Sequence, residues 1–245
     1  MLYKFTKRIL DLFIASFLLI LLAPLFIMTI IILKLTAEHE VFFFQQRIGY
    51  KNKPFYIWKF ATMLKNSANI GSGVITIKND SRVTTFGKFL RISKINELPQ
   101  IINVFRGEMT IVGPRPLMQV SFNLYSDEIK KSIYNCKPGI TGVGSLVFRN
   151  EEEIVSKALD PAIMYSTIYP YKGKLELWYQ KHASIFTDVS LILITAWSIP
   201  FPDSQLICRV FPDIPISQSP SFGHSGRPDK KYWISLIPST SSLTQ

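Results

Sequence analysis

The sequence predicts an α/β protein that is mostly helical and enters a membrane through its N-terminal segment. Residues 12–33 carry no charged side chain and read LFIASFLLILLAPLFIMTIIIL. Two short aromatic and β-branched runs flank a turn between residues 41 and 63, which is the pattern of a strand pair. Much of the remaining chain shows helical periodicity, so strands form the smaller part of the expected fold.

Charge and composition limit the partners. The chain has 245 residues and a formal net charge of +11, so it is attracted to anionic surfaces such as lipid headgroups and phosphorylated ligands. Hydrophobic residues make up 47% of it, which is high for a freely soluble protein. Cys136 and Cys208 are far apart and fit no metal-ligand spacing. No nucleic-acid-binding motif is present, so the positive charge alone does not indicate nucleic acid.

The apolar N-terminal segment allows two interpretations. A straight helix over residues 12–33 would be about long enough to span a bilayer core of ~30 Å. Pro24 lies within the run, however, and a break there leaves arms of roughly 18 and 15 Å, each too short to span. Basic residues stand on both sides, with Lys7 and Arg8 before the run and Lys34 after it. This symmetry favours a re-entrant hairpin with both ends on the cytoplasmic face.

The sequence divides into three regions: a membrane hairpin or helix over 1–36, a cytoplasmic domain over 37–200, and a Pro- and Ser-rich tail over 201–245 that is expected to be extended or disordered. Residues 66–85 read as a polar loop with one short strand at most. Gly107 should end the second of the expected helices, and a glycine-punctuated loop covers 137–144. The expected helices cover residues 85–92, 96–105, 119–134, 151–165 and 174–199.

Asn96 and Glu97 begin the segment Asn96-Glu97-Leu98-Pro99-Gln100, which has a structural and a functional interpretation. Asn is a good N-cap and Glu suits the positive end of a helix, so the segment can simply begin a helix. The same geometry would gather free N–H groups for a phosphate, and Glu97 would suit Mg²⁺.

Arg115 stands between two prolines in Gly113-Pro114-Arg115-Pro116. A guanidinium on such a stiff loop binds a phosphate through two parallel hydrogen bonds with little loss of entropy.

These motifs, in this order, resemble the signature of the bacterial sugar transferases, the monotopic phosphoglycosyl transferases. The resemblance covers roughly residues 4–200. It includes Lys7-Arg8, Gln46-Arg47-Ile48-Gly49, Lys59-Phe60, Thr62-Met63, Asp80-Ser81-Arg82-Val83-Thr84, Arg91, Glu97 through Gln100, Gly107-Glu108, Gly113 through Pro116 and Lys137 through Gly142. The chain departs from the family pattern at Ala23, where Ser is usual, at Ala61, where Arg is usual, and after Gly142, where Trp-Gln is absent.

The resemblance implies an enzyme of the bacterial inner (cytoplasmic) membrane whose catalytic domain faces the cytoplasm. Such an enzyme passes a sugar 1-phosphate from a nucleotide diphosphate sugar, expected to be a UDP-sugar, to polyprenyl phosphate with the help of Mg²⁺, and so initiates polysaccharide assembly. Membrane lipid is a further partner, nucleic acid is not, and a homo-oligomer stays open. The implied roles are catalysis for Asn96 and Glu97, metal binding for Glu97 and Glu108, substrate binding for Lys59, Arg82, Arg91, Gly113, Pro114 and Arg115, and membrane anchoring for Lys7, Arg8 and Pro24.

Asn96 replaces the Asp that serves as nucleophile in the resembling family. A carboxamide is neutral and a very poor nucleophile, so three outcomes stay open. Glu97 attacks in place of the Asp, with the metal held by other groups. Alternatively, the lipid phosphate attacks directly in a single displacement while Asn96 only hydrogen-bonds the β-phosphate. In the third outcome the protein binds both substrates without turnover, as a catalytically silent membrane partner of a glycan assembly complex. We expect an active enzyme that needs Glu97, because the other phosphate-handling residues are largely retained.

Overall fold

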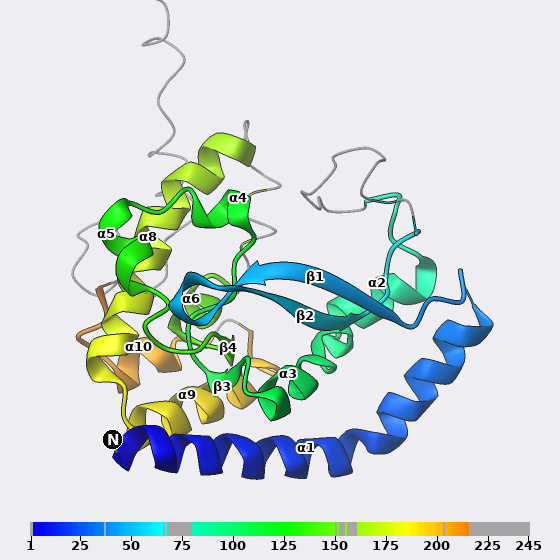
Figure 1. The fold of residues 1–245 in the computed structure, drawn as a ribbon, viewed down its shortest axis with the longest axis horizontal. Coiled ribbons are helices and arrows are strands. Elements are labelled where there is room, and N and C mark those ends of the chain that lie inside the picture. The colour runs from blue at the N-terminus through cyan, green and yellow to red at the C-terminus, as the bar shows by residue number, and fades with distance from the viewer. Residues whose placement is uncertain are drawn as a thin grey trace, which may run out of the picture. The chain divides into compact units, whose positions relative to one another are not determined.

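A computed structural model describes residues 2–36, 38–65, 67, 80–149, 151, 155, 161–202 and 204–215 (Figure 1). These residues are mostly helical, as predicted, with two small two-stranded sheets. The chain divides into two compact units, the first made of residues 1–49 and 53–111 and the second of residues 50–52 and 112–245. The N-terminal helix belongs to the first of these units, and the three-region division stays a prediction.

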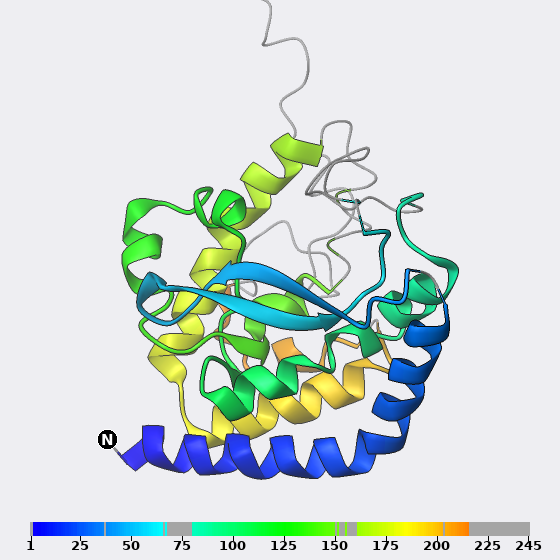
Figure 2. The same cartoon turned by 45° about the vertical axis from the view of Figure 1, so that its right-hand side comes forward.

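Helix α1 (Leu2–Leu35) is long and apolar enough to cross a membrane. Its ribbon bends in the second half, where Pro24 lies (Figures 1 and 2). Proline removes one backbone hydrogen bond and crowds the preceding turn, which accounts for the bend. Only 11% of the most apolar part of α1 is buried. Most of this apolar surface is therefore available to lipid.

The N-terminal arm of α1 is fixed to helix α3 (Gln100–Arg106) by Arg8. The two terminal nitrogens of its guanidinium, Nη1 and Nη2, donate to the carbonyl oxygens of Val104 and Phe105 at 2.6 and 2.9 Å. Carbonyls at a helix C-terminus have no partner within the helix, so a cation is stabilising there. Lys7, in the same turn of α1, is half-buried. Arg8 thus caps the C-terminal end of α3. The sequence predicted only its place near the membrane.

Asp11 is a second polar anchor on the same arm and is only 5% exposed. Its Oδ2 accepts from the Thr110 hydroxyl at 2.6 Å, and its Oδ1 accepts from the backbone N–H of Ile111 at 3.0 Å. A carboxylate in an apolar helix is costly unless it is hydrogen-bonded, and both of its oxygens are used here. The arm is therefore docked in one register.

The C-terminal arm of α1 packs into the hydrophobic core of the first unit. Its Leu33 is 1% exposed and contacts other side chains of the core. The buried members of this core are Leu33, Val41, Phe60 and Leu90, and Phe26, Ile30, Phe42, Phe86, Ile95 and Leu98 pack against them. Both arms of the bent helix thus contact the same unit.

Strands β1 (Phe42–Ile48) and β2 (Pro54–Phe60) form the predicted hairpin of residues 41–63. They pair antiparallel from Phe42 opposite Phe60 to Ile48 opposite Pro54. The turn η1 (Tyr50–Asn52) joins them and is grouped with the second unit. The chain beyond β2 continues the pairing, because Met63 bridges Val83. Most of the predicted loop over 66–85 lies outside the described residues.

Helix α2 (Thr85–Ile92) has the predicted bounds. The Thr84 side chain caps it by accepting from the Gly87 N–H at 3.0 Å. A side chain at Gly87 would lie 2.2 Å from the Thr62 carbonyl oxygen, so only glycine fits this approach. The second predicted helix begins later than expected: residues 95–97 form the 3-10 turn η3 (Ile95–Glu97), and α3 starts at Gln100. Gly107 ends α3 with φ 77°, as predicted.

Strand β3 (Thr110–Val112) ends where the second unit begins, and that unit is helical apart from β4 (Gly139–Thr141) among the described residues. The helix predicted over 119–134 is two short ones, because Ser126 starts a new helix by accepting from the Ile129 N–H. The helix predicted over 174–199 is likewise broken where Ser184 caps a new one. The remaining helices are α4 (Gln119–Phe122), α5 (Asp127–Ser132), α6 (Val143–Val147), α8 (Pro161–His182), α9 (Ile185–Ser198) and α10 (Leu206–Val210).

Two predictions concern the ends of this unit. Most of the helix predicted over 151–165 lies outside the described residues, and its last part belongs to α8. Part of the segment predicted to be an extended tail is folded: α10 lies within it, and Ile207, Phe211 and Ile214 are buried. Residues 216–245 of that tail lie outside the described residues.

Removing the Asp11 carboxylate should loosen α1. We expect Asp11→Ala to lower stability by about 1–3 kcal/mol, because it leaves the Ile111 N–H and the Thr110 hydroxyl buried without an acceptor. Thermal unfolding of the detergent-solubilised protein measures the change. Lys4→Ala, an exposed change on the same arm, is the control. Equal melting temperatures for Asp11→Ala and Lys4→Ala would contradict the docking role.

Candidate functional site

The Asn96–Glu97 pair lies in η3, directly after a sharp turn. Lys94 adopts a left-handed conformation with φ 61°, which reverses the chain between α2 and η3. The turn places Glu97 beside β2, where its Oε1 lies 3.7 Å from the Nζ of Lys59. Both side chains are mostly buried, with 18% and 15% of their surface exposed. A partly accessible carboxylate next to an ammonium group is thus the centre of this site.

The backbone around Asn96 does not form the predicted helix start. The N–H groups of Glu97 and Leu98 donate to the carbonyls of Lys94 and Ile95 within the 3-10 turn. Pro99, which has no N–H, precedes the first residue of α3. Two of the N–H groups expected to bind a phosphate are therefore already used within the turn. Among the described residues, the Oδ1 of Asn96 is buried and has no hydrogen-bond partner, which is unusual for a native structure.

Asn103 holds the strand that carries Lys59. It is fully buried, and its Oδ1 accepts from the Trp58 N–H at 3.0 Å. Its Nδ2 donates to the Tyr56 carbonyl and to the Oε2 of Glu108, each at 2.8 Å. A carboxamide satisfied on both sides between a helix and a strand fixes their spacing. The position of Lys59 relative to the first unit's helices depends on this residue.

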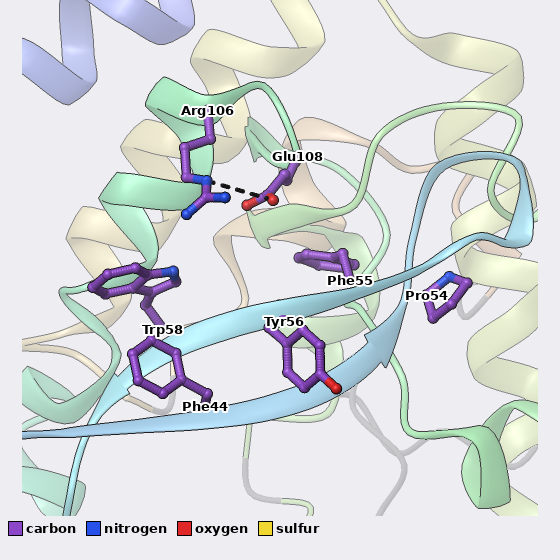
Figure 3. Close-up of a pocket in the computed structure, with 7 residues that line it drawn as sticks. All are labelled: Phe44, Pro54, Phe55, Tyr56, Trp58, Arg106 and Glu108. Atoms are coloured by element: carbon purple, nitrogen blue, oxygen red, sulfur yellow. Dashed lines mark ion pairs between the residues drawn. The ribbon is translucent and has the colours of Figure 1, made fainter.

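Glu108 lines a cavity of about 560 Å³ in the first unit (Figure 3). Its Oε1 lies 3.5 Å from the Nε of Arg106, and the aromatic side chains come from the two strands. The lining residues are Phe44, Pro54, Phe55, Tyr56, Trp58, Arg106 and Glu108. Aromatic faces beside one cation and one anion suit a flat polar ring more than a metal ion.

The fit of the expected Mg²⁺ differs between the two predicted ligands. Mg²⁺ takes oxygen ligands and is commonly held by one or two carboxylates together with substrate phosphates. Glu97 and the preceding residue Asn96, whose Oδ1 has no hydrogen-bond partner, offer such oxygens. Both oxygens of Glu108 are already engaged by Asn103 and Arg106. Within the described ranges, no three His, Cys, Asp or Glu residues come together as a metal group.

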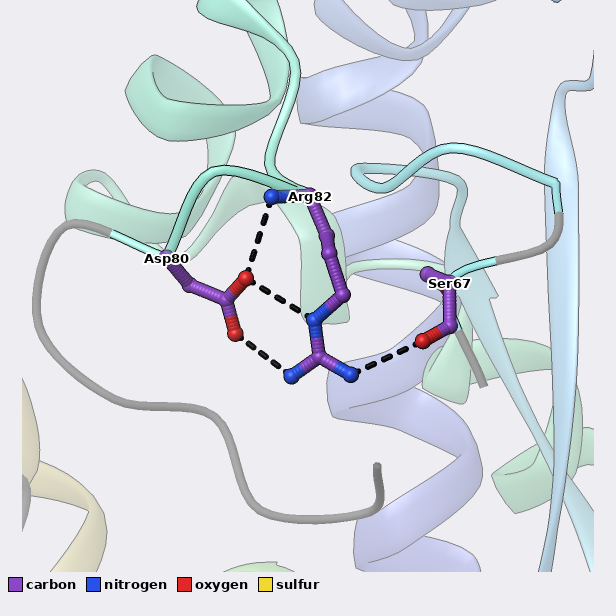
Figure 4. A network of polar contacts seen from close by, with 3 residues as sticks. All are labelled: Ser67, Asp80 and Arg82. Atoms are coloured by element: carbon purple, nitrogen blue, oxygen red, sulfur yellow. Dashed lines mark hydrogen bonds and ion pairs between the residues drawn. The ribbon is translucent and has the colours of Figure 1, made fainter. Parts of the chain in front are cut away.

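Arg82 is bound internally (Figure 4). It is 3% exposed, and its guanidinium donates two hydrogen bonds to the Asp80 carboxylate at 2.8 and 2.5 Å. A third donor reaches the Ser67 carbonyl at 2.8 Å. The hydrogen bonds from Arg82 lower the pKa of Asp80 to about 2, against the opposing effect of burial. This pair fixes the loop that precedes α2 and leaves little of Arg82 for a substrate.

Arg91 lies in the last turn of α2 and is half-buried. Its charge also lowers the pKa of Asp80, by a smaller amount than Arg82 does. Arg91 therefore lies in the electrostatic neighbourhood of the Asp80–Arg82 pair, and its predicted substrate role stays a prediction.

The second unit holds the loop Gly113–Pro116. Gly113 and Pro114 are buried, whereas Arg115 is half-buried at the tip. The Gly113 N–H donates to the Thr141 carbonyl, and the Gly139 N–H donates to the Pro114 carbonyl, both at 2.9 Å. The structure thus brings together two motifs that lie more than twenty residues apart in the sequence.

Glycines allow these two loops to approach closely. A Cβ added to Gly139 would lie 2.1 Å from the Gly113 nitrogen, and one added to Gly142 would lie 2.3 Å from the Gly113 oxygen. The absence of a side chain at Gly144 makes space for the Glu176 side chain. A Cβ at Gly144 would lie 2.4 Å from the Oε1 of Glu176. Any larger residue would separate the loops.

Glu176, on α8, is a buried acid that the sequence analysis does not select. Burial raises its pKa to about 7, and this rise is opposed by Lys172, by hydrogen bonds from the backbone of Arg115 and Gly144, and by the Arg115 charge. An acid between Leu175 and Leu177 was the available signal. The sequence analysis does not select Asn103 either, because nothing in its residue type distinguishes a structural amide from a surface one.

These features define a class: a membrane-associated protein with an acid–lysine site in one unit and a rigid arginine loop in the other, both suited to phosphorylated ligands. The chain belongs to the bacterial sugar transferase family, whose sequence profile matches residues 2–201.

Similar proteins support this membership. The chain is 34% identical over 196 residues to the UDP-glucose:undecaprenyl-phosphate glucose-1-phosphate transferase of Klebsiella pneumoniae, covering 78% of this chain and 39% of the relative. It is 33% identical over 189 residues to the uncharacterized sugar transferase EpsL of Bacillus subtilis (strain 168), covering 77% and 84%. It is 33% identical over 199 residues to the UDP-N-acetylgalactosamine-undecaprenyl-phosphate N-acetylgalactosaminephosphotransferase of Aeromonas hydrophila, covering 80% and 44%. The chain therefore spans less than half the length of two of these relatives.

We expect Arg82 to contribute to the stability of the protein more than to substrate binding. We expect Arg82→Ala to destabilise the protein by about 3–5 kcal/mol, because it leaves the buried Asp80 carboxylate without its partner. Denaturant unfolding measures this loss, and Arg91→Ala serves as a control arginine in the same unit. If Arg82→Ala unfolds like the unaltered protein, Arg82 is free for the substrate role that the sequence predicts.

Proposed function

We propose that this protein transfers a sugar 1-phosphate from a nucleotide diphosphate sugar, a UDP-sugar, to polyprenyl (undecaprenyl) phosphate and so initiates polysaccharide or glycoconjugate assembly. The observation that carries the proposal is the Glu97–Lys59 pair in the Asn-Glu turn of a sugar transferase family member. Relatives named for glucose and for N-acetylgalactosamine transfer to undecaprenyl phosphate support the reaction class. Their different sugars leave the donor sugar to experiment.

The membrane helix suits a reaction between a soluble donor and a lipid acceptor. We propose that α1 enters the inner membrane from the cytoplasmic side and returns to it. The contacts of Arg8 and Asp11 on one arm, and of Leu33 on the other, favour this arrangement, since both arms bind one unit. A straight spanning helix would carry one arm away from its contacts.

Glu97 is the residue on which transfer depends in this proposal. Its carboxylate either attacks the β-phosphorus of the donor, expelling the nucleoside monophosphate, or assists direct attack by the lipid phosphate. In the first route the lipid phosphate then attacks the same phosphorus and frees the carboxylate. Lys59, 3.7 Å from Glu97, offsets negative charge on the carboxylate and on the phosphates. Asn96 can donate its amide N–H to a phosphate oxygen, but it does not attack.

We propose that Mg²⁺ binds at Glu97 and the Asn96 oxygen rather than at Glu108. When bound, the ion neutralises the diphosphate and polarises its P–O bonds.

The role proposed for Arg115 is separate from metal binding. Arg115 grips a donor phosphate from the stiff loop between Pro114 and Pro116.

The activity of the unaltered chain and of Glu97→Gln tests the proposal. We expect the protein, in detergent or vesicles, to move a labelled sugar phosphate from one of a panel of UDP-sugars to undecaprenyl phosphate. Glu97→Gln should reduce kcat/KM at least about 100-fold, because the amide neither attacks nor binds a metal well. Chelation of Mg²⁺ should also stop transfer. Lys174→Ala, an exposed change on α8, is the control variant.

Each result has a defined meaning. Transfer by Glu97→Gln at the unaltered rate would remove the role assigned to Glu97. Release of nucleoside monophosphate without lipid acceptor would indicate attack by the enzyme, and its dependence on acceptor would indicate direct attack by lipid phosphate. No transfer with any donor in the panel would contradict the proposed function.

Asn96→Asp separates an active enzyme from a silent partner. We expect the unaltered protein to be active, with Asn96→Asp changing kcat by no more than about tenfold, because Glu97, Lys59 and Arg115 are the same in both proteins. Parallel assays of the two proteins, at equal concentration and with the same donor, measure this. Activity that appears only in Asn96→Asp would instead make the natural protein a non-catalytic member of a glycan assembly complex.

A further inference from the structure

We propose that Glu176 is a positioning residue for sugar-phosphate transfer: it holds the backbone of Arg115 so that the Arg115 guanidinium is presented to the donor. This inference rests on the proposed function. It concerns the second unit alone, and Glu176 itself contacts no substrate.

The backbone of Arg115 is held on both sides by side chains from outside its loop. Its N–H donates to the Glu176 carboxylate. Its carbonyl accepts from the Tyr134 hydroxyl at 2.8 Å, and the same hydroxyl accepts from the Leu117 N–H at 3.0 Å. One residue of the chain is thus fixed at its donor and at its acceptor. These two contacts restrain the backbone of Arg115 and leave its side chain to be directed from a fixed base.

The burial of Glu176 is costly and needs a reason. The residue is 2% exposed, and a hydrophobic residue would fill the same place at lower cost. Its nearby cation, Lys172, is also bound to Glu151 at 2.8 and 2.9 Å, so Lys172 does not neutralise Glu176 alone. What a carboxylate supplies, and a leucine does not, is an acceptor for the N–H groups of Arg115 and Gly144.

The neighbouring loop is shaped around this carboxylate. Gly144 lies so close that a Cβ there would be 2.4 Å from the Glu176 Oε1, and Gly142 would place one 3.7 Å from its Oε2. Gly142 also contacts Gly113, at the start of the arginine loop. The carboxylate therefore joins three segments that must stay together for Arg115 to keep one direction.

Steady-state kinetics of paired variants test the inference. We expect Glu176→Ala to raise the KM for the sugar donor at least about tenfold with a smaller change in kcat, because the unheld loop presents Arg115 less often. Glu176→Gln keeps an acceptor oxygen and should stay within about threefold of the unaltered protein. Lys174→Ala, on the exposed side of the same helix, is the matched control.

A double variant distinguishes positioning from general support. If Glu176 acts through Arg115, the pair Arg115→Ala with Glu176→Ala should bind donor no worse than Arg115→Ala alone. Losses that multiply would overturn the inference, and so would a Glu176→Ala protein with the donor KM of the control.

Hydrogen exchange keeps the test independent of activity. The Arg115 amide should exchange at least about tenfold faster in Glu176→Ala than in the unaltered protein, while the Leu117 amide, held by Tyr134, changes less. An unchanged Arg115 amide would overturn the inference even if transfer is seen. Absence of transfer in the unaltered protein, together with faster exchange, would count against the proposed function and not against the contact.

Discussion

The buried carboxamide of Asn103 is the interaction on which the first unit's site depends. It bonds to the backbone on both sides of Ile57, at the Tyr56 carbonyl and the Trp58 N–H, and to Glu108, and so sets the distance between α3 and β2. Lys59 follows Trp58 directly, and Glu97 lies just before α3. The 3.7 Å separation between the Lys59 and Glu97 side chains is therefore a result of backbone spacing set elsewhere. A side-chain pair held this way is positioned by the backbone and needs no further contacts to fix its spacing.

Buried charges organise the rest of the protein in a similar manner. Asp11 receives two donors, Arg82 and Asp80 satisfy each other, and Glu176 receives backbone N–H groups. Each case joins segments far apart in the sequence or fixes a loop whose shape has no strand or helix to define it. Such charges lower stability unless every partner is in place, so they select one arrangement of loops over near alternatives.

The sequence predicted local elements well where local chemistry decides them. The hairpin follows from aromatic alternation, and α2 has its predicted bounds because Thr84 caps it. The helix start predicted at Asn96 is wrong, because the turn at Lys94 and the position of Pro99 move the start of α3 to Gln100. No sequence pattern indicates that a lysine adopts a left-handed conformation. The motif predicts substrate binding by Arg82. Its burial beside Asp80 depends on tertiary contacts, which the motif does not reveal. Glu176 was missed for the same reason: its significance depends on glycines more than thirty residues away.

The cap that Arg8 places on α3 links the membrane helix to the part of the first unit that holds Glu97 and Lys59. A change in how deeply α1 lies in the bilayer must either break those two hydrogen bonds or pull on the C-terminal end of α3, the helix that carries Asn103. The activity of the enzyme should thus depend on bilayer thickness and detergent micelle size, as it depends on pH or ionic strength. A rate measured in one amphiphile therefore applies to one depth of α1 and to one position of α3 relative to it.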